Sequence, residues 1–152
     1  MQSNTLPCER YVSFTLQDIN YVQEVTKMLE VMTKKVREPE DISNFMIGRY
    51  NSYQSFLDSL IKNYFLEDAA SIMPTPAMKA YLTTYRTVMM NEDPIYFAVA
   101  LLPCARLWVW LANNMEIPEN NVYHQWQEDN RSGHPEMHYK ALLNKYLDTE
   151  EK

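Results

Sequence analysis

The sequence predicts an all-α protein, a bundle of helices around one strongly apolar helix. Three observations favour this fold class. The 152 residues include only two glycines against ten methionines and eleven tyrosines, so turn formers are scarce and helix-compatible residues abundant. Apolar residues recur at spacings of three and four, the period of a helix face. Residues 93–115 are apolar on nearly every side, which is typical of a buried helix.

The central helix is expected from Asp93 to Met115. Asp93 can accept hydrogen bonds from the first free amides, and Pro94 suits the first helical position, where its missing N–H loses no partner. About 18 apolar residues in succession would be typical of a membrane span. Pro103 and Arg106 interrupt this stretch, so we expect the core helix of a soluble bundle and no membrane partner.

Pro103 predicts a kink beside a thiol. Because proline has no N–H, the carbonyl of Val99 loses its helical donor. Cys104, Trp108 and Leu111 then share one face through their spacings of four and three. A kinked, buried helix can hold a small pocket in a bundle. A buried cysteine, however, is more often a small hydrophobic residue than a nucleophile.

The remaining helices are bounded mainly by prolines. Pro74-Thr75-Pro76 predicts a turn in which Thr75 caps the following helix and Pro76 takes its first position. Residues 129–135 are expected to form a loop because of their composition. The expected helices lie between 7 and 39, from about 41 to 65, from 76 to about 90, from 93 to 115, briefly around 122–126, and from about 136 to a charged tail at 148–152.

A carboxylate interrupts the apolar stripe of the first helix. Asp18 lies in register with Tyr11, Phe14, Tyr21 and Val25. Burying a carboxylate without a partner is costly, so Asp18 must be hydrogen-bonded or face a polar cavity. A structural role, in which Asp18 bonds a neighbouring tyrosine or a helix end, and a ligand-binding role both remain open.

Composition argues against several classes of function. The net charge of -6 provides no basic surface for nucleic acid. Two cysteines, Cys8 and Cys104, make neither a disulfide framework nor a metal site, and without a secretory signal we expect a cytoplasmic protein. The chain has no Glu-x-x-His pair and no histidine in a long apolar stripe, so we expect no di-iron site, no haem and no other metal or cofactor.

Four short strings carry a family resemblance. They are T-L-P-C-E-R-Y-V-S-F-T-L-Q-D-I-N-Y at 5–21, the P-T-P turn at 74–76 followed by Tyr81, A-L-L-P-C at 100–104, and Y-H-Q-W at 123–126. Together, in this order, they resemble the TenA/THI-4 family (thiaminase II, or aminopyrimidine aminohydrolase). The resemblance extends from about residue 5 to residue 146. It implies a haem-oxygenase-like helical bundle without haem, formed as one domain over residues 1–152.

The resemblance also implies a site and a reaction. Asp18 would bind an aminopyrimidine through its ring nitrogen and exocyclic amine, with Tyr21 beside it. Tyr81 would be the active-site tyrosine and Cys104 the nucleophile that forms a covalent intermediate resolved by water. Trp108, which stands where many members have tyrosine, could stack on the ring. The implied activity is hydrolysis of aminopyrimidine or thiamin-related compounds.

The chain departs from the family at both ends. The family has a helix before its T-L-P string and further helices after its Y-x-x-W segment, the last carrying a glutamate that acts as acid and base. Glu150 and Glu151 lie instead in a charged tail. Enzymatic activity is therefore left open, and the alternative is a non-catalytic descendant acting as a binding or scaffold subunit. Apolar surface left uncovered would be covered by a second copy or by another protein.

Overall fold

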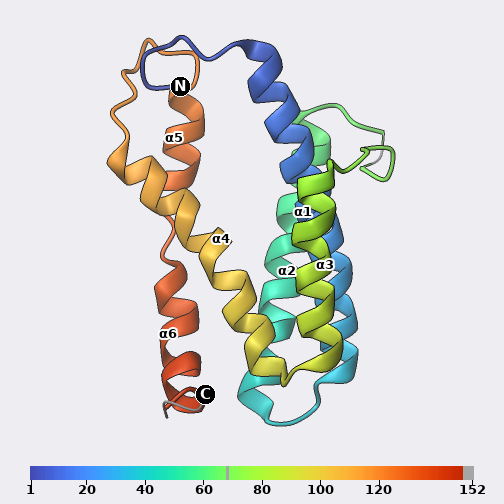
Figure 1. Cartoon of the computed structure of the whole chain (residues 1–152). Helices are drawn as coiled ribbons and strands as arrows, with labels where there is room; N and C mark the ends of the chain where they lie inside the picture. Colours follow the sequence, from blue (N-terminus) through green and yellow to red (C-terminus); the bar gives the residue numbers. More distant parts are fainter. Residues whose placement is uncertain (68, 149–152) are drawn as a thin grey trace. The chain divides into compact units, whose positions relative to one another are not determined.

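The computed structural model describes residues 1–67 and 69–148, and these residues form six helices and no strands. The all-α prediction is confirmed. Glu150 and Glu151 lie outside the described residues. The helices, shown in Figure 1, are α1 (Cys8–Lys35), α2 (Glu40–Asn63), α3 (Pro76–Asn91), α4 (Pro94–Asn114), α5 (His124–Arg131) and α6 (Pro135–Tyr146).

The predicted helix starts are confirmed at α3 and α4. The hydroxyl of Thr75 accepts a hydrogen bond from the amide of Met78 at 3.2 Å, and Pro76 occupies the first position of α3. Before α4, the carboxylate of Asp93 accepts from the amide of Ile95 at 3.1 Å. Each cap satisfies an amide that has no partner within its own helix.

The loop expected at residues 129–135 begins later than predicted. Asp129 and Arg131 belong to α5. Gln125 donates to the Asp129 carboxylate at 2.8 Å, and Arg131 pairs with Glu128 at 2.7 Å. These contacts between residues three and four apart support one more helical turn. The prediction that the loop starts at Asp129 is therefore wrong.

The chain packs as two compact units. Unit 1 comprises Met1–Tyr11 and Ala98–Lys152, and unit 2 comprises Val12–Phe97. The boundaries fall inside α1 and α4, so each of these helices contributes residues to both units. A single domain over residues 1–152 stays a prediction.

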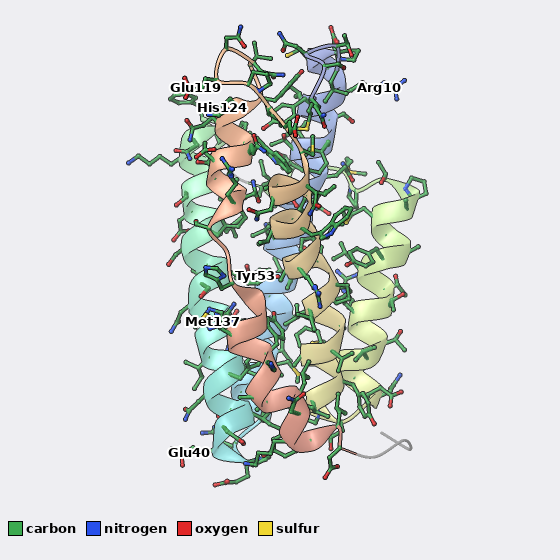
Figure 2. The ribbon with its side chains drawn as sticks, turned by 90° about the vertical axis from the view of Figure 1, so that its left-hand side faces the viewer. Arg10, Glu40, Tyr53, Glu119, His124 and Met137 are labelled. Carbon is green, nitrogen blue, oxygen red and sulfur yellow. The ribbon has the colours of Figure 1, made fainter. Side chains whose placement is uncertain are left out.

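Unit 2 is built on three helices that lie side by side, α1, α2 and α3, followed by the first residues of α4 (Figure 1). In Figure 2, α2 starts at Glu40 and carries Tyr53 near its middle. Each fully buried aliphatic side chain in such a core contributes about 1.5–3 kcal/mol. The core is made of Ile19, Val25, Met28, Leu29, Met32, Ile42, Met46, Leu82, Tyr85, Met89 and Phe97.

Polar contacts tie the chain's first residues into unit 1. Asn121 donates to the carbonyl of Met1 at 2.9 Å, and the hydroxyl of Tyr123 donates to the carbonyl of Leu6 at 2.7 Å. The buried amide of Gln127 donates to Ala112 at 2.8 Å and so joins α5 to α4. These bonds join the first residues of the chain, α4 and α5 within unit 1.

Helix α4 is less enclosed than its composition predicts. Leu107 and Trp110 are 46% and 56% exposed, so the expectation of burial on all sides is wrong for this part of the helix. With a mean hydropathy of 1.7, α4 is the one helix among residues 1–67 and 69–148 long and apolar enough to cross a membrane. Length and composition alone do not distinguish a membrane span from a bundle helix.

Candidate functional site

Three tyrosines from two helices meet in unit 2. The rings of Tyr21, on α1, and Tyr81, on α3, stack with centroids 5.7 Å apart. Tyr85 meets both rings edge-on, at 5.8 Å from Tyr21 and 4.9 Å from Tyr81. Edge-on and offset ring pairs are the favourable aromatic geometries. The structure therefore brings together two of the predicted site tyrosines.

A chain of hydroxyls links the same three residues. The hydroxyls of Tyr21 and Tyr85 lie 3.2 Å apart, and those of Tyr85 and Tyr81 lie 2.8 Å apart. Tyr21 and Tyr85 are 3% and 2% exposed, whereas Tyr81 is 40% exposed. The chain thus leads from the core of unit 2 to solvent. Because each hydroxyl can donate or accept, such a chain can reorient around a bound polar group.

Tyr85 is the member of this cluster that sequence reasoning missed. Neither the four family strings nor an unusual residue type marked it as a site residue. The available signal was its spacing of four from Tyr81, which places the two rings on one face of α3. Spacing could not show that the Tyr85 hydroxyl bonds the hydroxyl of Tyr21 on another helix.

Asp18 lies on α1, three residues before Tyr21 and therefore one helical turn away. Its side chain is half-buried. Among the described residues no hydrogen bond or ion pair reaches it, so the structural alternative, a bond to a tyrosine or a helix end, finds no support. Burial raises the pKa of the Asp18 carboxyl from 3.8 to about 6, because removal from water disfavours the charged form.

The raised pKa gives Asp18 a specific chemical capacity. Near neutral pH the carboxyl is mostly ionised, yet a proton can be added with little free energy. It can therefore accept from an amine and exchange a proton with a ring nitrogen. Titratable groups with perturbed pKa values cluster at functional sites, which makes Asp18 a candidate for a functional carboxyl.

Cys104 and Trp108 belong to unit 1, on α4. Both are half-buried, and Cys104 is in no disulfide bond. The Trp108 ring meets the ring of Trp126 edge-on, with centroids 6.3 Å apart. Unit 1 thus packs the A-L-L-P-C helix against the Y-H-Q-W segment. The other cysteine, Cys8, is exposed and is also in no disulfide bond.

Metal coordination finds no ready set of ligands in the part of the chain that the structure describes. Within residues 1–67 and 69–148, no three side chains from His, Cys, Asp and Glu are grouped so that they could hold an ion. The groups available for chemistry are a carboxyl and three phenols in unit 2, and a thiol in unit 1.

These features define the class of protein: an all-helical bundle with a half-buried carboxyl near a tyrosine cluster, and a cysteine after a helix proline. The family model of the TENA/THI-4/PQQC family matches residues 1–147, and the chain belongs to this family. The family predicted from the four sequence strings is thereby confirmed. No curated protein matches the sequence.

Proposed function

We propose that this protein binds a small aminopyrimidine through Asp18 and hydrolyses it with Cys104 as nucleophile. The observation that carries the proposal is Asp18, a half-buried carboxyl with a pKa of about 6 and no protein partner among the described residues. A carboxyl that is removed from water without a partner destabilises the folded protein. A ligand that pairs with it therefore gains free energy on binding.

An aminopyrimidine suits such a carboxyl. One oxygen accepts from the exocyclic amine while the other shares a proton with the neighbouring ring nitrogen, which makes a charge-assisted two-point contact. Tyr21 lies one turn along α1 from Asp18, and its ring stacks on that of Tyr81, which is 40% exposed and can offer aromatic surface and a hydroxyl to a ligand. Charge pairing and aromatic contact together would favour a flat, basic heterocycle over an aliphatic amine.

The implied reaction proceeds by covalent catalysis. The thiolate of Cys104 forms a bond to the carbon that bears the leaving amine, the C–N bond breaks, and the amine takes a proton from water as it departs. Water then attacks the same carbon, the C–S bond breaks, and the thiolate is restored. Asp18, with its pKa near 6, can hold the ring-nitrogen proton that makes this carbon electrophilic.

Calorimetric titration tests the binding step. We expect 4-amino-5-aminomethyl-2-methylpyrimidine to bind the wild-type protein and to bind Asp18→Asn at least tenfold more weakly, because the variant loses a charge-assisted contact. Asp58→Asn is the matched control, since Asp58 is an exposed carboxylate on α2. Equal affinities for wild type and Asp18→Asn would show that Asp18 does not recognise the ligand.

Turnover is tested separately with Cys104→Ser, after Cys8 has been replaced by Ser in every protein compared. We expect product release to fall by at least a hundredfold while ligand binding persists, because a hydroxyl is a much poorer nucleophile than a thiolate. Binding without any turnover in the wild-type protein would favour the alternative, a non-catalytic descendant that serves as a binding or scaffold subunit.

The proposal also covers location and assembly. We infer a cytoplasmic protein, because no disulfide bond joins Cys8 to Cys104 in the structure and disulfide bonds are rare in that compartment. We further infer association with a second copy or a protein partner, because apolar residues such as Leu107 and Trp110 are exposed on α4.

A further inference from the structure

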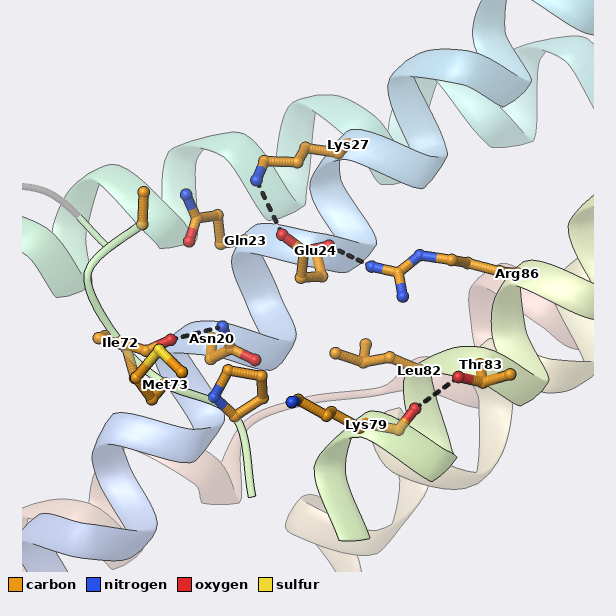
Figure 3. A pocket seen from close by; sticks show the side chains of 12 residues that line it. Asn20, Gln23, Glu24, Lys27, Ile72, Met73, Lys79, Leu82, Thr83 and Arg86 are labelled. Carbon is orange, nitrogen blue, oxygen red and sulfur yellow. Dashed lines mark hydrogen bonds and ion pairs between the residues drawn. The ribbon is translucent and has the colours of Figure 1, made fainter. Parts of the chain in front are cut away.

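A second candidate binding site lies in unit 2, in a pocket of about 460 Å³. Its walls come from α1, from α3 and from the segment that leads into α3 (Figure 3). Pockets of about 300–1,000 Å³ are of the size that holds small organic ligands. Asp18, Tyr21 and Tyr81 do not line it, so this pocket is not the aminopyrimidine site proposed above.

Hydrogen bonds from α1 hold the pocket wall in place. Gln17 binds the segment twice: its amide donates to the carbonyl of Met73 at 3.1 Å, and its oxygen accepts from the amide of Thr75 at 2.8 Å. Asn20 adds a third bond, donating to the carbonyl of Ile72 at 3.3 Å. These contacts join positions more than 50 residues apart in the sequence. The wall of the pocket is therefore fixed by tertiary hydrogen bonds within unit 2.

Two lining residues carry buried oxygens without hydrogen-bond partners. Asn20 is 5% exposed, and its Oδ1 accepts no bond; the Oε1 of Gln23 is in the same state. The orientation of the Asn20 amide follows from its bond to Ile72, since only the nitrogen end can donate to a carbonyl. Leaving a buried acceptor unpaired is unfavourable, because the oxygen has lost its hydrogen bonds to water. Both oxygens therefore favour a ligand that brings N–H donors.

The charges of the lining residues place a second requirement on the ligand. The described lining residues include three cations, Lys27, Lys79 and Arg86, and one carboxylate, Glu24. Glu24 pairs with Lys27 at 2.8 Å and with Arg86 (Figure 3). Burial opposes ionisation of Glu24, but both partners outweigh it and lower the pKa of this carboxyl. The pocket is therefore net positive, and it favours an anion.

Lys79 is the cation best placed to meet such an anion. Its ammonium group makes no ion pair with a described residue, and in Figure 3 it points toward the side of the pocket that holds Asn20. Its side chain is exposed and flexible. A ligand reaches the enclosed Asn20 oxygen only if a side chain of the pocket wall rotates, and Lys79 and Met73 are exposed enough to do so. Buried Leu82 adds an apolar contact for a carbon skeleton.

We propose that this pocket binds a small organic anion that also carries a neutral N–H group, such as an amide, a urea or an amino-heterocycle. The N–H donors would pair with Asn20 and Gln23, while the carboxylate or phosphate would pair with Lys79 and Arg86. A neutral donor suits the site better than an ammonium group, because the three cations would repel a second positive charge.

The test is a titration of the isotope-labelled full chain with N-carbamoyl-β-alanine, followed by calorimetry and by the NMR signal of the Asn20 side-chain amide. Its phosphonate analogue distinguishes the two kinds of anion. Pentanoate lacks N–H donors and methylurea lacks the anion. We expect N-carbamoyl-β-alanine or its phosphonate analogue to bind at least tenfold more tightly than pentanoate or methylurea, and to shift the Asn20 signal.

Variants assign the contacts. Asn20→Leu removes the unpaired oxygen at similar volume and is expected to weaken binding about tenfold. Lys79→Met, at an exposed position where the fold is not at risk, is expected to weaken it about threefold or more. The matched control, Lys34→Met, changes the same charge outside the pocket and should leave the affinity unaltered.

Three results would overturn the proposal. One is the absence of saturable binding of both ureido acids to the folded protein. Another is equal affinity for pentanoate and N-carbamoyl-β-alanine, because the N–H donors would then contribute nothing. The third is a loss of affinity in Lys34→Met as large as that in Lys79→Met, which would indicate non-specific attraction to the cationic surface.

Discussion

Asp18 has two effects that oppose each other. Its carboxyl would bind a heterocycle, but in the unliganded protein the ionised carboxyl destabilises the fold. In the unfolded chain its pKa is near 3.8, and in the folded chain it is about 6. Below the lower value both states are protonated, so the group has no effect. Between the two values the unfolded state loses its proton first, and stability falls as the pH rises.

We therefore predict that Asp18→Asn stabilises the protein at neutral pH but not in acid. The substitution should raise the free energy of unfolding by at most about 3 kcal/mol, and by less where water reaches the carboxyl. Urea denaturation of wild type and variant at about pH 4 and about pH 7 measures it. Asp58→Asn, an exposed change of the same kind, corrects for general charge effects. A difference between the Asp18 variant and wild type that stays constant with pH would contradict the prediction.

Tyr85 joins the other two phenols through its hydroxyl, which makes it the central member of the cluster. Tyr85→Phe removes the contacts at 3.2 Å and 2.8 Å, and we predict a loss of about 1–2 kcal/mol in the free energy of unfolding. Tyr81→Phe removes only the second contact at a position that water reaches, so its loss should be smaller. Thermal denaturation compares the two. A larger loss for Tyr81→Phe would mean that the hydroxyl chain does not depend on Tyr85.

At the scale of the elements, the two glycines differ in what surrounds them. A Cβ at Gly133, before α6, would lie 2.6 Å from the Val109 side chain on α4, whereas a Cβ at Gly48, within α2, would meet nothing within 4 Å. Valine has one strongly preferred rotamer in a helix and cannot turn aside cheaply. Gly133 thus permits close packing between α4 and the segment before α6.

From this difference we predict opposite effects of the same substitution. Gly133→Ala should lower the free energy of unfolding by about 1–3 kcal/mol through overpacking. Gly48→Ala should raise it by up to about 1 kcal/mol through improved helix propensity. Equilibrium denaturation of both variants beside wild type provides the measurement, each serving as the control for the other. Stabilisation by Gly133→Ala would show that the contact with Val109 relaxes freely.

For the whole molecule, exposed apolar side chains on α4 are the basis for predicting self-association. Leu107 and Trp110, three residues apart and therefore on one helical face, are both substantially exposed. We predict that light scattering after gel filtration gives a mass that is a multiple of 18.0 kDa. Trp110→Glu should shift the protein toward the monomer, because a charged residue disfavours an apolar interface.

A control for this experiment is Val122→Glu, which introduces the same charge at another exposed apolar position in unit 1. We expect it to leave the mass unchanged. A monomeric wild-type protein would contradict self-association and would turn attention to a different protein partner. Dissociation by both variants would indicate a general charge effect rather than an interface at Trp110.

Local features explain why much of the fold was predictable. The period of the apolar residues located the helices, and the Thr75 and Asp93 caps followed from residues adjacent in the chain. Asp18 stood out because a carboxylate in an apolar stripe is visible without a structure. The end of α5 was misjudged, since the loop-like composition from Asp129 onward was outweighed by side-chain pairs spaced three and four apart.

The sequence by itself determined the fold class, the helix starts and the family, because these depend on neighbouring residues, on helical periodicity and on strings of adjacent letters. Only the tertiary structure decided that Tyr85 bridges Tyr21 and Tyr81, that burial raises the Asp18 pKa, and that Asn20 leaves an oxygen unpaired in a pocket. Tyr21 and Tyr85 are 64 positions apart. Contacts over such separations depend on how each helix is rotated against its neighbours, and the pattern along one helix does not specify that rotation.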